Sequence, residues 1–334
     1  MVKKSLNKIS PLAPKGIKRL SPVEGVSLYT YCANLYNKQR NDLSVFLFHN
    51  KSFIAEVFTK SSLRSATLDW NSKALKGREV QAIVVNSGNA NTFTGKQGER
   101  AIEEVVKTIA SQFKVSKKKI FVASTGVIGE PFPTQKVIKA IKEKKSPSKN
   151  WIDAARSIMT TDTYPKGISI NTSIGNQKIR ITGIAKGSGM IEPNMATMLG
   201  FIFTDAELSQ SILKSLISKF IPNSFNSISV DGDESTNDTV ILTSTNAKKM
   251  NKKIHSINDK RLKNFKLDLE KVFLYLAEQI VRDGEGATKL IEVNVTNARS
   301  RLSAEKISRS IANSPLIKTA IYGRDPNWGR VIMA

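Results

Sequence analysis

One threonine stands out in the sequence as a candidate nucleophile. Residues 183–200 read GIAKGSGMIEPNMATMLG, an apolar stretch rich in Gly and Met whose only charged residues are Lys186 and Glu192. A Thr hydroxyl is a weak nucleophile unless a base stands beside it, and the α-amine of an N-terminal Thr is such a base. The segment therefore predicts a chain that cleaves itself between Ala196 and Thr197. A Gly-rich turn that leads into the strand LGFIF is the alternative that the spacing alone leaves open.

The histidine content argues against a conventional catalytic triad. The chain holds two histidines, His49 in an apolar run and His255 in a polar stretch. Neither sequence context is typical of a buried catalytic base. This favours a threonine that generates its own base by cleavage of the bond before it.

Apolar runs and helical stripes alternate along the chain and predict the elements that position this segment. Strands are expected at residues 44–49, 52–58, 81–88, 119–125, 199–205, 227–230, 239–243 and 289–296, with two more within 168–184 around a turn at Gly175 and Asn176. Helices are expected at residues 98–113, 133–144, 151–159, 206–220 and 262–281. The mixture, on both sides of Thr197, predicts an α+β fold of layered sheets covered by helices.

The formal net charge of +24 raises the question of nucleic-acid binding. The lysines lie in separate polar segments, at residues 117–119, 142–149, 248–253 and 260–266, and few aromatic residues lie among them. Stacking platforms for bases are therefore not evident. We expect no nucleic-acid partner, while a positive surface favours the approach of small anionic substrates.

Other common sites and targeting signals are not indicated. No run approaches the about 20 apolar residues of a membrane span, and the basic N-terminus has no apolar segment after it. The single cysteine, Cys32, fits a reducing cytoplasm. The chain has no zinc-ligand spacing, dinucleotide fingerprint or P-loop, and the loop DGDESTND lacks the Glu of a calcium loop. We expect neither a metal nor a bound cofactor, and no membrane partner.

The string KGSGMIEPNMATML closely resembles the self-cleavage motif of the ornithine acetyltransferase family, the bifunctional glutamate N-acetyltransferases. Six further segments match this family in its own order between Asn86 and Arg330, while the first 85 residues match more weakly. These segments are NSGNANTFTG (86–95), ASTGVIGEP (123–131), MTTDTYPK (159–166), VDGDESTNDT (230–239), DGEGATK (283–289) and YGRDPNWGR (322–330).

The resemblance implies a fold like that of other N-terminal-nucleophile proteins. It implies cleavage into an α chain, residues 1–196, and a β chain, residues 197–334, assembled as a heterotetramer of two of each. The implied reaction, in cytoplasmic arginine biosynthesis, moves acetyl from N2-acetyl-L-ornithine to L-glutamate through an acetyl ester of Thr197. Some members of the family also use acetyl-CoA as donor.

The resemblance also assigns an oxyanion hole. Acyl transfer passes through a tetrahedral oxyanion that needs hydrogen-bond donors placed in advance. In the family, the residues that match Thr125 and Gly126 supply these donors. Read without the resemblance, the segment STG is a strand-to-loop turn.

Substrate positioning is implied for Thr163, Lys186, Glu285 and Thr197 itself. Lys186 is expected to hold an α-carboxylate or to polarise the scissile carbonyl, and Glu285 to pair with a substrate ammonium. The neighbouring Thr160 and Thr161 lie close enough in sequence to take the role of Thr163.

Two other functions remain open at this stage. The first is a self-cleaving N-terminal-nucleophile amidohydrolase or aminopeptidase, in which water takes the place of glutamate. The second is a non-catalytic member that only binds amino acids. In the resembling family the chain continues for several dozen residues beyond YGRDPNWGR, with an Asn and a Ser or Thr that contact substrate, so we expect defective acetyl transfer without them.

Overall fold

The computed structural model describes residues 9–16, 19–36, 39–143, 145–192 and 198–334. Within this part of the chain, eight strands form one sheet with the order β4-β3-β2-β8-β7-β6-β5, and β1 pairs with β2. The strands are β1 (Val26–Tyr31), β2 (Leu43–Phe58), β3 (Glu79–Asn89), β4 (Ile120–Val127), β5 (Lys166–Ile174), β6 (Gln177–Lys186), β7 (Leu199–Ala206) and β8 (Thr239–Lys248). The helices are α1 (Ala66–Ala74), α2 (Gly95–Phe113), α3 (Thr134–Lys142), α4 (Ile152–Ser157), α5 (Gln210–Phe220), α6 (Lys263–Arg282), α7 (Arg301–Asn313), α8 (Pro315–Gly323) and α9 (Gly329–Met333).

The sheet folds over on itself through the long strand β2. The pairing of β2 with β3 shifts register between Leu47 and Ser52. The first half of β2 pairs with β1 and β3, and the second half, after a short further contact with β3 at Ser52 and Phe53, pairs with β8. The two halves then face each other: the ring of Phe46 on β2 lies 4.7 Å from that of Phe203 on β7, although β8 separates these strands in the sheet. Trp151 closes the same apolar layer, 5.2 Å from Phe203.

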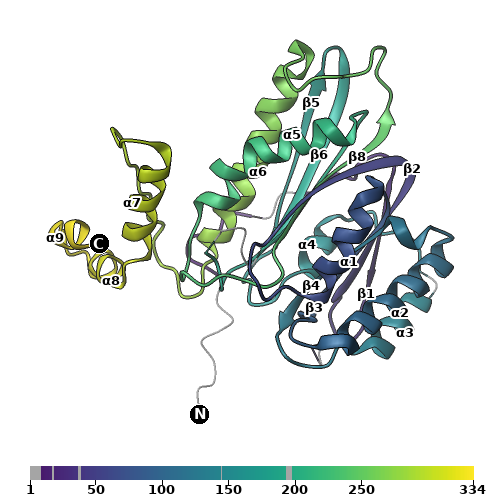
Figure 1. Ribbon diagram of the computed structural model, residues 1–334, viewed down its shortest axis with the longest axis horizontal. Coiled ribbons are helices and arrows are strands. Elements are labelled where there is room, and N and C mark those ends of the chain that lie inside the picture. The colour runs from purple at the N-terminus through teal and green to yellow at the C-terminus, as the bar shows by residue number, and fades with distance from the viewer. Residues whose placement is uncertain (1–8, 17–18, 37–38, 144, 193–197) are drawn as a thin grey trace.

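Alternating side chains on each strand build the outer layers, as the period of two requires. On β7, Phe201 and Phe203 face the inner layer, whereas Ile202 packs in the cluster that contains the buried faces of α5 and α6. On β3, Ile83 faces inward, whereas Val84 joins the cluster under α2 and α3. Two sheet layers covered by helices result (Figure 1), and the predicted α+β layered fold is confirmed.

The helical stripes also lie where the sequence pattern puts them. The predicted helix at residues 98–113 is α2, and its stripe of Ala101, Ile102, Val105 and Ile109 is buried. The predicted helix at residues 262–281 is α6, which packs against β5 and β6.

Two strand predictions are wrong, and two others merge. The runs at 44–49 and 52–58 are strand as predicted but form a single strand, β2, because the chain between them continues through an irregular register without leaving the sheet. Residues 227–230 form no strand: Ser227 ends a short 3-10 helix, η4 (Phe225–Ser227), and residues 228–230 are irregular. Residues 289–296 have an alternating pattern but form no ladder in the described structure, and they lead instead to α7, α8 and α9, which project away from the sheets (Figure 1). A strand needs a neighbour to accept its backbone hydrogen bonds, and a local pattern does not supply one.

The predicted cleavage bond, Ala196–Thr197, lies outside the described residues. Its surroundings are described: β6 and β7 are antiparallel neighbours, and Lys186 at the end of β6 is paired with Leu199 at the start of β7. The proposed pieces, 1–196 and 197–334, would therefore remain joined through the pairs β6–β7 and β2–β8.

Among the helices of the described residues, none has the length and apolar character that crossing a membrane requires.

Candidate active site

Two of the predicted site residues meet at the ends of β4 and β6. Lys186 Nζ donates a hydrogen bond of 2.9 Å to Thr125 Oγ1, across a separation of 61 residues in sequence. Both residues are buried, Lys186 at 3% exposure and Thr125 at 6%. The folding of the sheet therefore joins the ASTGVIGEP motif to the start of the motif KGSGMIEPNMATML.

Gly126 follows Thr125 at a point where β3 and β4 come unusually close. Its φ is +135°, and an added Cβ would fall 2.2 Å from the carbonyl carbon of Gly88 and 2.4 Å from the nitrogen of Asn89. Both obstacles are backbone atoms, so no side-chain movement can relieve the clash. Only glycine fits here, for a structural reason that the resemblance did not provide.

The surroundings of Lys186 shift the pKa of its side chain. Burial lowers the pKa of Lys186, and the nearby Lys166 lowers it too, whereas Asp162, Asp238 and Glu285 oppose the shift. Burial therefore disfavours the charged form of Lys186, and the three carboxyl groups around it favour that form. A charged donor in such a place interacts strongly with any negative charge that develops beside it.

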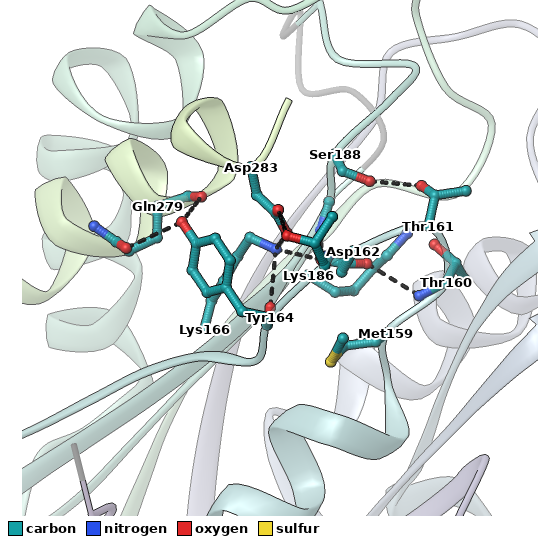
Figure 2. A network of polar contacts seen from close by, with 12 residues as sticks. Met159, Thr160, Thr161, Asp162, Tyr164, Lys166, Lys186, Ser188, Gln279 and Asp283 are labelled. Atoms are coloured by element: carbon teal, nitrogen blue, oxygen red, sulfur yellow. Dashed lines mark hydrogen bonds and ion pairs between the residues drawn. The ribbon is translucent and has the colours of Figure 1, made fainter. Parts of the chain in front are cut away.

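A second lysine, Lys166, organises the segments behind Lys186 (Figure 2). Its Nζ lies 2.6 Å from Asp162 Oδ1 and 2.6 Å from Asp283 Oδ2, and none of the three side chains is exposed. Burial by itself raises the pKa of Asp162, but Lys166, Lys186 and the Gly187 N–H outweigh it and bring the pKa to about 2. Neither this lysine nor either aspartate was predicted from the sequence as a site residue.

Each aspartate of this group also fixes backbone. Asp162 accepts hydrogen bonds from the N–H of Thr160 at 3.0 Å and of Gly187 at 2.8 Å. Asp283 accepts one from the N–H of Thr163 at 2.9 Å. The network therefore locks three motifs together: MTTDTYPK, the turn after Lys186, and DGEGATK.

Glu285 lies at the edge of this network and is exposed. Its N–H donates to the Ser188 carbonyl at 2.8 Å, and a Cβ placed on Gly189 would fall 2.6 Å from Glu285 Oε1. The carboxylate thus lies over the GSG turn, within range to affect the charge of Lys186. An exposed carboxylate beside a buried ammonium is an arrangement that can receive a zwitterion.

Thr163 lies in the network with its hydroxyl already committed. It donates to Asp283 Oδ1 and accepts a hydrogen bond of 2.9 Å from the N–H of Ser10. The Thr161 hydroxyl instead contacts Ser188 Oγ at 2.5 Å, in the turn that holds Glu285. The substrate-binding role predicted for Thr163 stays a prediction, and Thr161 lies nearer to the exposed part of the site.

Thr197, the predicted nucleophile, lies outside the described residues, as does Ala196. The residue that follows them is held firmly: the Met198 N–H donates to Asp238 Oδ1 at 2.6 Å. Asp238 is a residue that the sequence analysis missed. It stands in the segment VDGDESTNDT, where its neighbours indicated a polar turn and no signal separated a buried carboxyl from a solvated one.

Comparison with known proteins decides the family. The model of the ArgJ family matches residues 28–334. The chain belongs to the ArgJ family. Its relatives include the arginine biosynthesis bifunctional protein ArgJ of Bradyrhizobium diazoefficiens, 45% identical over 331 residues, and that of Brucella suis, 46% identical over 330 residues. Each alignment covers 98% of this chain and 80% of the relative.

A solved ArgJ structure shares part of the fold. The crystal structure of the arginine biosynthesis bifunctional protein argJ of Bacillus halodurans is similar with a TM-score of 0.50 and 30% identity. The match covers 53% of this chain and 94% of that one. The predicted family is confirmed, and with it, at the level of the ArgJ family, the prediction of an acetyltransferase of arginine biosynthesis.

The buried lysine should be far more important for stability than a surface one. Lys166→Met leaves Asp162 and Asp283 without their shared cation, so we expect a loss of about 3–5 kcal/mol in the free energy of unfolding. The matched control is Lys271→Met, which breaks a solvent-exposed pair with Asp268 and should cost less than about 1 kcal/mol. Urea unfolding of both variants measures the difference, and equal losses would contradict the assigned role of Lys166.

Two Gly→Ala substitutions should distinguish the cost of a backbone clash from the cost of a positive φ alone. Gly126→Ala forces a methyl into backbone atoms, so we expect little folded protein. Gly129→Ala is the control, because its φ is +84° but no heavy atom lies within 4 Å of the new Cβ. That variant should fold and lose about 1–2 kcal/mol. Yield and urea midpoint check this, and a Gly126→Ala variant as stable as Gly129→Ala would show that β3 and β4 lie further apart.

Proposed function

We propose that this chain is a self-cleaving acetyltransferase that moves acetyl from N2-acetyl-L-ornithine to L-glutamate through an acetyl ester of Thr197. The observation that carries the proposal is the buried contact of Lys186 with Thr125 beside the segment that contains Thr197. Membership of the ArgJ family, whose matching relatives are named for arginine biosynthesis, supports the substrates. Ornithine would leave in the first half-reaction and N-acetylglutamate in the second.

The first event would be cleavage. The Thr197 hydroxyl attacks the Ala196 carbonyl, the peptide becomes an ester, and water hydrolyses the ester to free the α-amine of Thr197. In the mature enzyme the same hydroxyl attacks the acetyl carbon of the donor, with the α-amine as general base. Residues 1–196 and 197–334 then act together as an α and a β chain.

Thr125 and Gly126 would stabilise the oxyanion of each step. Within the described part of the chain, Thr125 Oγ1 accepts from Lys186, while its own hydrogen has no acceptor. A hydroxyl that receives a hydrogen bond from an ammonium is a stronger donor in turn, because the bonds polarise one another. This supports the second of the roles expected for Lys186, polarisation of the reacting carbonyl, over direct contact with a carboxylate.

Glu285 would bind the ammonium of the amino-acid substrate, since its carboxylate is exposed at the edge of the site. Thr163 would complete the clamp by fixing Asp283, with Thr160 and Thr161 nearer to the substrate. An amino-acid substrate carries an ammonium, which the Glu285 carboxylate can pair with, and a carboxylate, which the threonine hydroxyls can donate to.

Three further features complete the proposal. Acetyl-CoA as a second donor fits the word bifunctional in the names of the relatives. The single cysteine, Cys32, fits a cytoplasmic location. The assembly of two α and two β chains rests on the family resemblance alone, and the mass of the particle in solution tests it.

Cleavage is the direct test of the proposal. The purified chain should separate into two pieces on a denaturing gel, and sequencing of the smaller piece should begin at Thr197. Thr197→Ala should remain whole because it lacks the hydroxyl, whereas Thr197→Ser should retain cleavage. A smaller piece that begins at any other residue, or an intact wild-type chain after prolonged incubation, would overturn the proposal and favour a non-catalytic member.

The rival function, an amidohydrolase, differs from the proposed transferase in the molecule that accepts the acetyl group: water instead of glutamate. If glutamate accelerates the loss of acetyl from N2-acetyl-L-ornithine, the chain is a transferase. If water alone suffices and glutamate has no effect on the rate, the amidohydrolase is correct.

A further inference from the structure

The proposed cleavage leaves one chemical requirement unassigned. Before cleavage the nitrogen of Thr197 is part of an amide and cannot act as a base, so another group must take the proton of the attacking hydroxyl. His49 and His255 are both exposed, and His49 is engaged with Ser27 at 2.7 Å. Lys186 directs a hydrogen to Thr125. These observations direct attention to the buried carboxyl groups beside the segment.

Among the buried carboxyl groups, Asp238 is held directly against the residue that follows Thr197. It is completely buried, and its Oδ1 accepts the Met198 N–H at 2.6 Å. That nitrogen is bonded directly to the carbonyl carbon of Thr197. Backbone hydrogen bonds hold the aspartate in place. The Thr59 N–H donates to the Asp238 carbonyl, and the backbone N–H of the next residue, Thr239, donates to the Met198 carbonyl.

The second oxygen of this carboxyl is free. Within the described residues, Asp238 Oδ2 is buried and has no hydrogen-bond partner. An unpartnered carboxyl oxygen in a protein interior is costly, and a catalytic role is one explanation for such a group. Asp231, in the same loop, is the contrast: its two oxygens accept the N–H groups of Met190 and Ile191, at 2.6 and 2.8 Å.

The charges around Asp238 suit a group that exchanges a proton. Burial raises the pKa of Asp238 well above its ordinary value, and Glu234 raises it further. The Met198 N–H and the ammonium of Lys186 act in the opposite direction. A carboxylate with a raised pKa is a stronger base than one in water, and a positive group nearby still allows it to ionise.

We propose that Asp238 is the general base of self-cleavage, an inference that rests on the proposed nucleophile. Its carboxylate takes the proton of Thr197 Oγ1 while that oxygen bonds to the Ala196 carbonyl carbon. The same proton then passes to the Thr197 nitrogen as the carbon–nitrogen bond breaks, which leaves an ester and restores the carboxylate. Water adds to the ester and gives the Ala196 carboxyl group, the free hydroxyl and the free amine.

The variant Asp238→Asn keeps an oxygen for the Met198 N–H but cannot accept a proton. Its matched control is Asp205→Asn on β7. Asp205 is also buried, its pKa is also raised by burial, and its Oδ1 accepts a hydrogen bond of 2.7 Å from the backbone N–H of Arg180. Each full-length chain is made by cell-free translation with labelled methionine and is chased from about pH 5 to about pH 9. Uncleaved and cleaved chain are then measured over time.

We expect Asp238→Asn to cleave about 100-fold to 10,000-fold more slowly than the wild type, and Asp205→Asn to cleave at the wild-type rate. The wild-type rate should rise with pH through the range above the ordinary Asp pKa, because only the ionised carboxyl accepts a proton. That rise should be absent from Asp238→Asn. Protease resistance of both variants before cleavage reports whether they fold.

The outcomes separate this inference from the proposed function. If Asp238→Asn cleaves as fast as Asp205→Asn, or keeps the wild-type pH profile, Asp238 is not the base. If Asp238→Asn does not fold, the wild-type profile decides: a rate that is flat with pH overturns the inference and a rise supports it. If the wild type does not cleave, or Thr197→Ala does, the proposed function itself fails.

Discussion

The site depends on one buried cation held by two buried anions. Lys166 lies between Asp162 and Asp283, and the three charged groups are completely removed from solvent. Such a group is expensive to bury and persists only when every charge is paired and every remaining oxygen accepts a hydrogen bond. Here the backbone N–H groups that complete the pairing belong to Thr160, Gly187 and Thr163. Because these backbone groups donate to the buried aspartates, the loops that contain them are fixed in place.

The same network reaches Lys186 and Thr125 through Asp162, whose charge acts on both lysines. Lys166 holds Asp162 ionised, the ionised Asp162 opposes the loss of charge on the buried Lys186, and Lys186 donates to Thr125. The folded sheet makes this possible, because it brings the end of β4 beside the junction of β6 and β7. Asp238, the residue before β8, approaches the same junction through its hydrogen bond with the Met198 N–H.

Much of this could be predicted from the sequence, and the failures have a common cause. The motif around Thr197, the stripe of α2 and the apolar run of β7 are local patterns, and each could be recognised in the sequence. The strand expected at residues 289–296 failed because a ladder needs a partner, and no local pattern reports one. Lys166, Asp162, Asp283 and Asp238 were missed for the same reason. The ion pair of Lys166 with Asp283 spans 117 residues, and a lysine in a polar motif is usually solvated.

The central claim is that these clamped segments serve a single acetylated threonine, and mass spectrometry of the quenched enzyme tests it most directly. After brief exposure to N2-acetyl-L-ornithine, the piece that begins at Thr197 should carry one acetyl group, and addition of glutamate should remove it. The kinetics should then be ping-pong. An unmodified piece together with sequential kinetics would mean direct transfer between substrates, and would contradict the account.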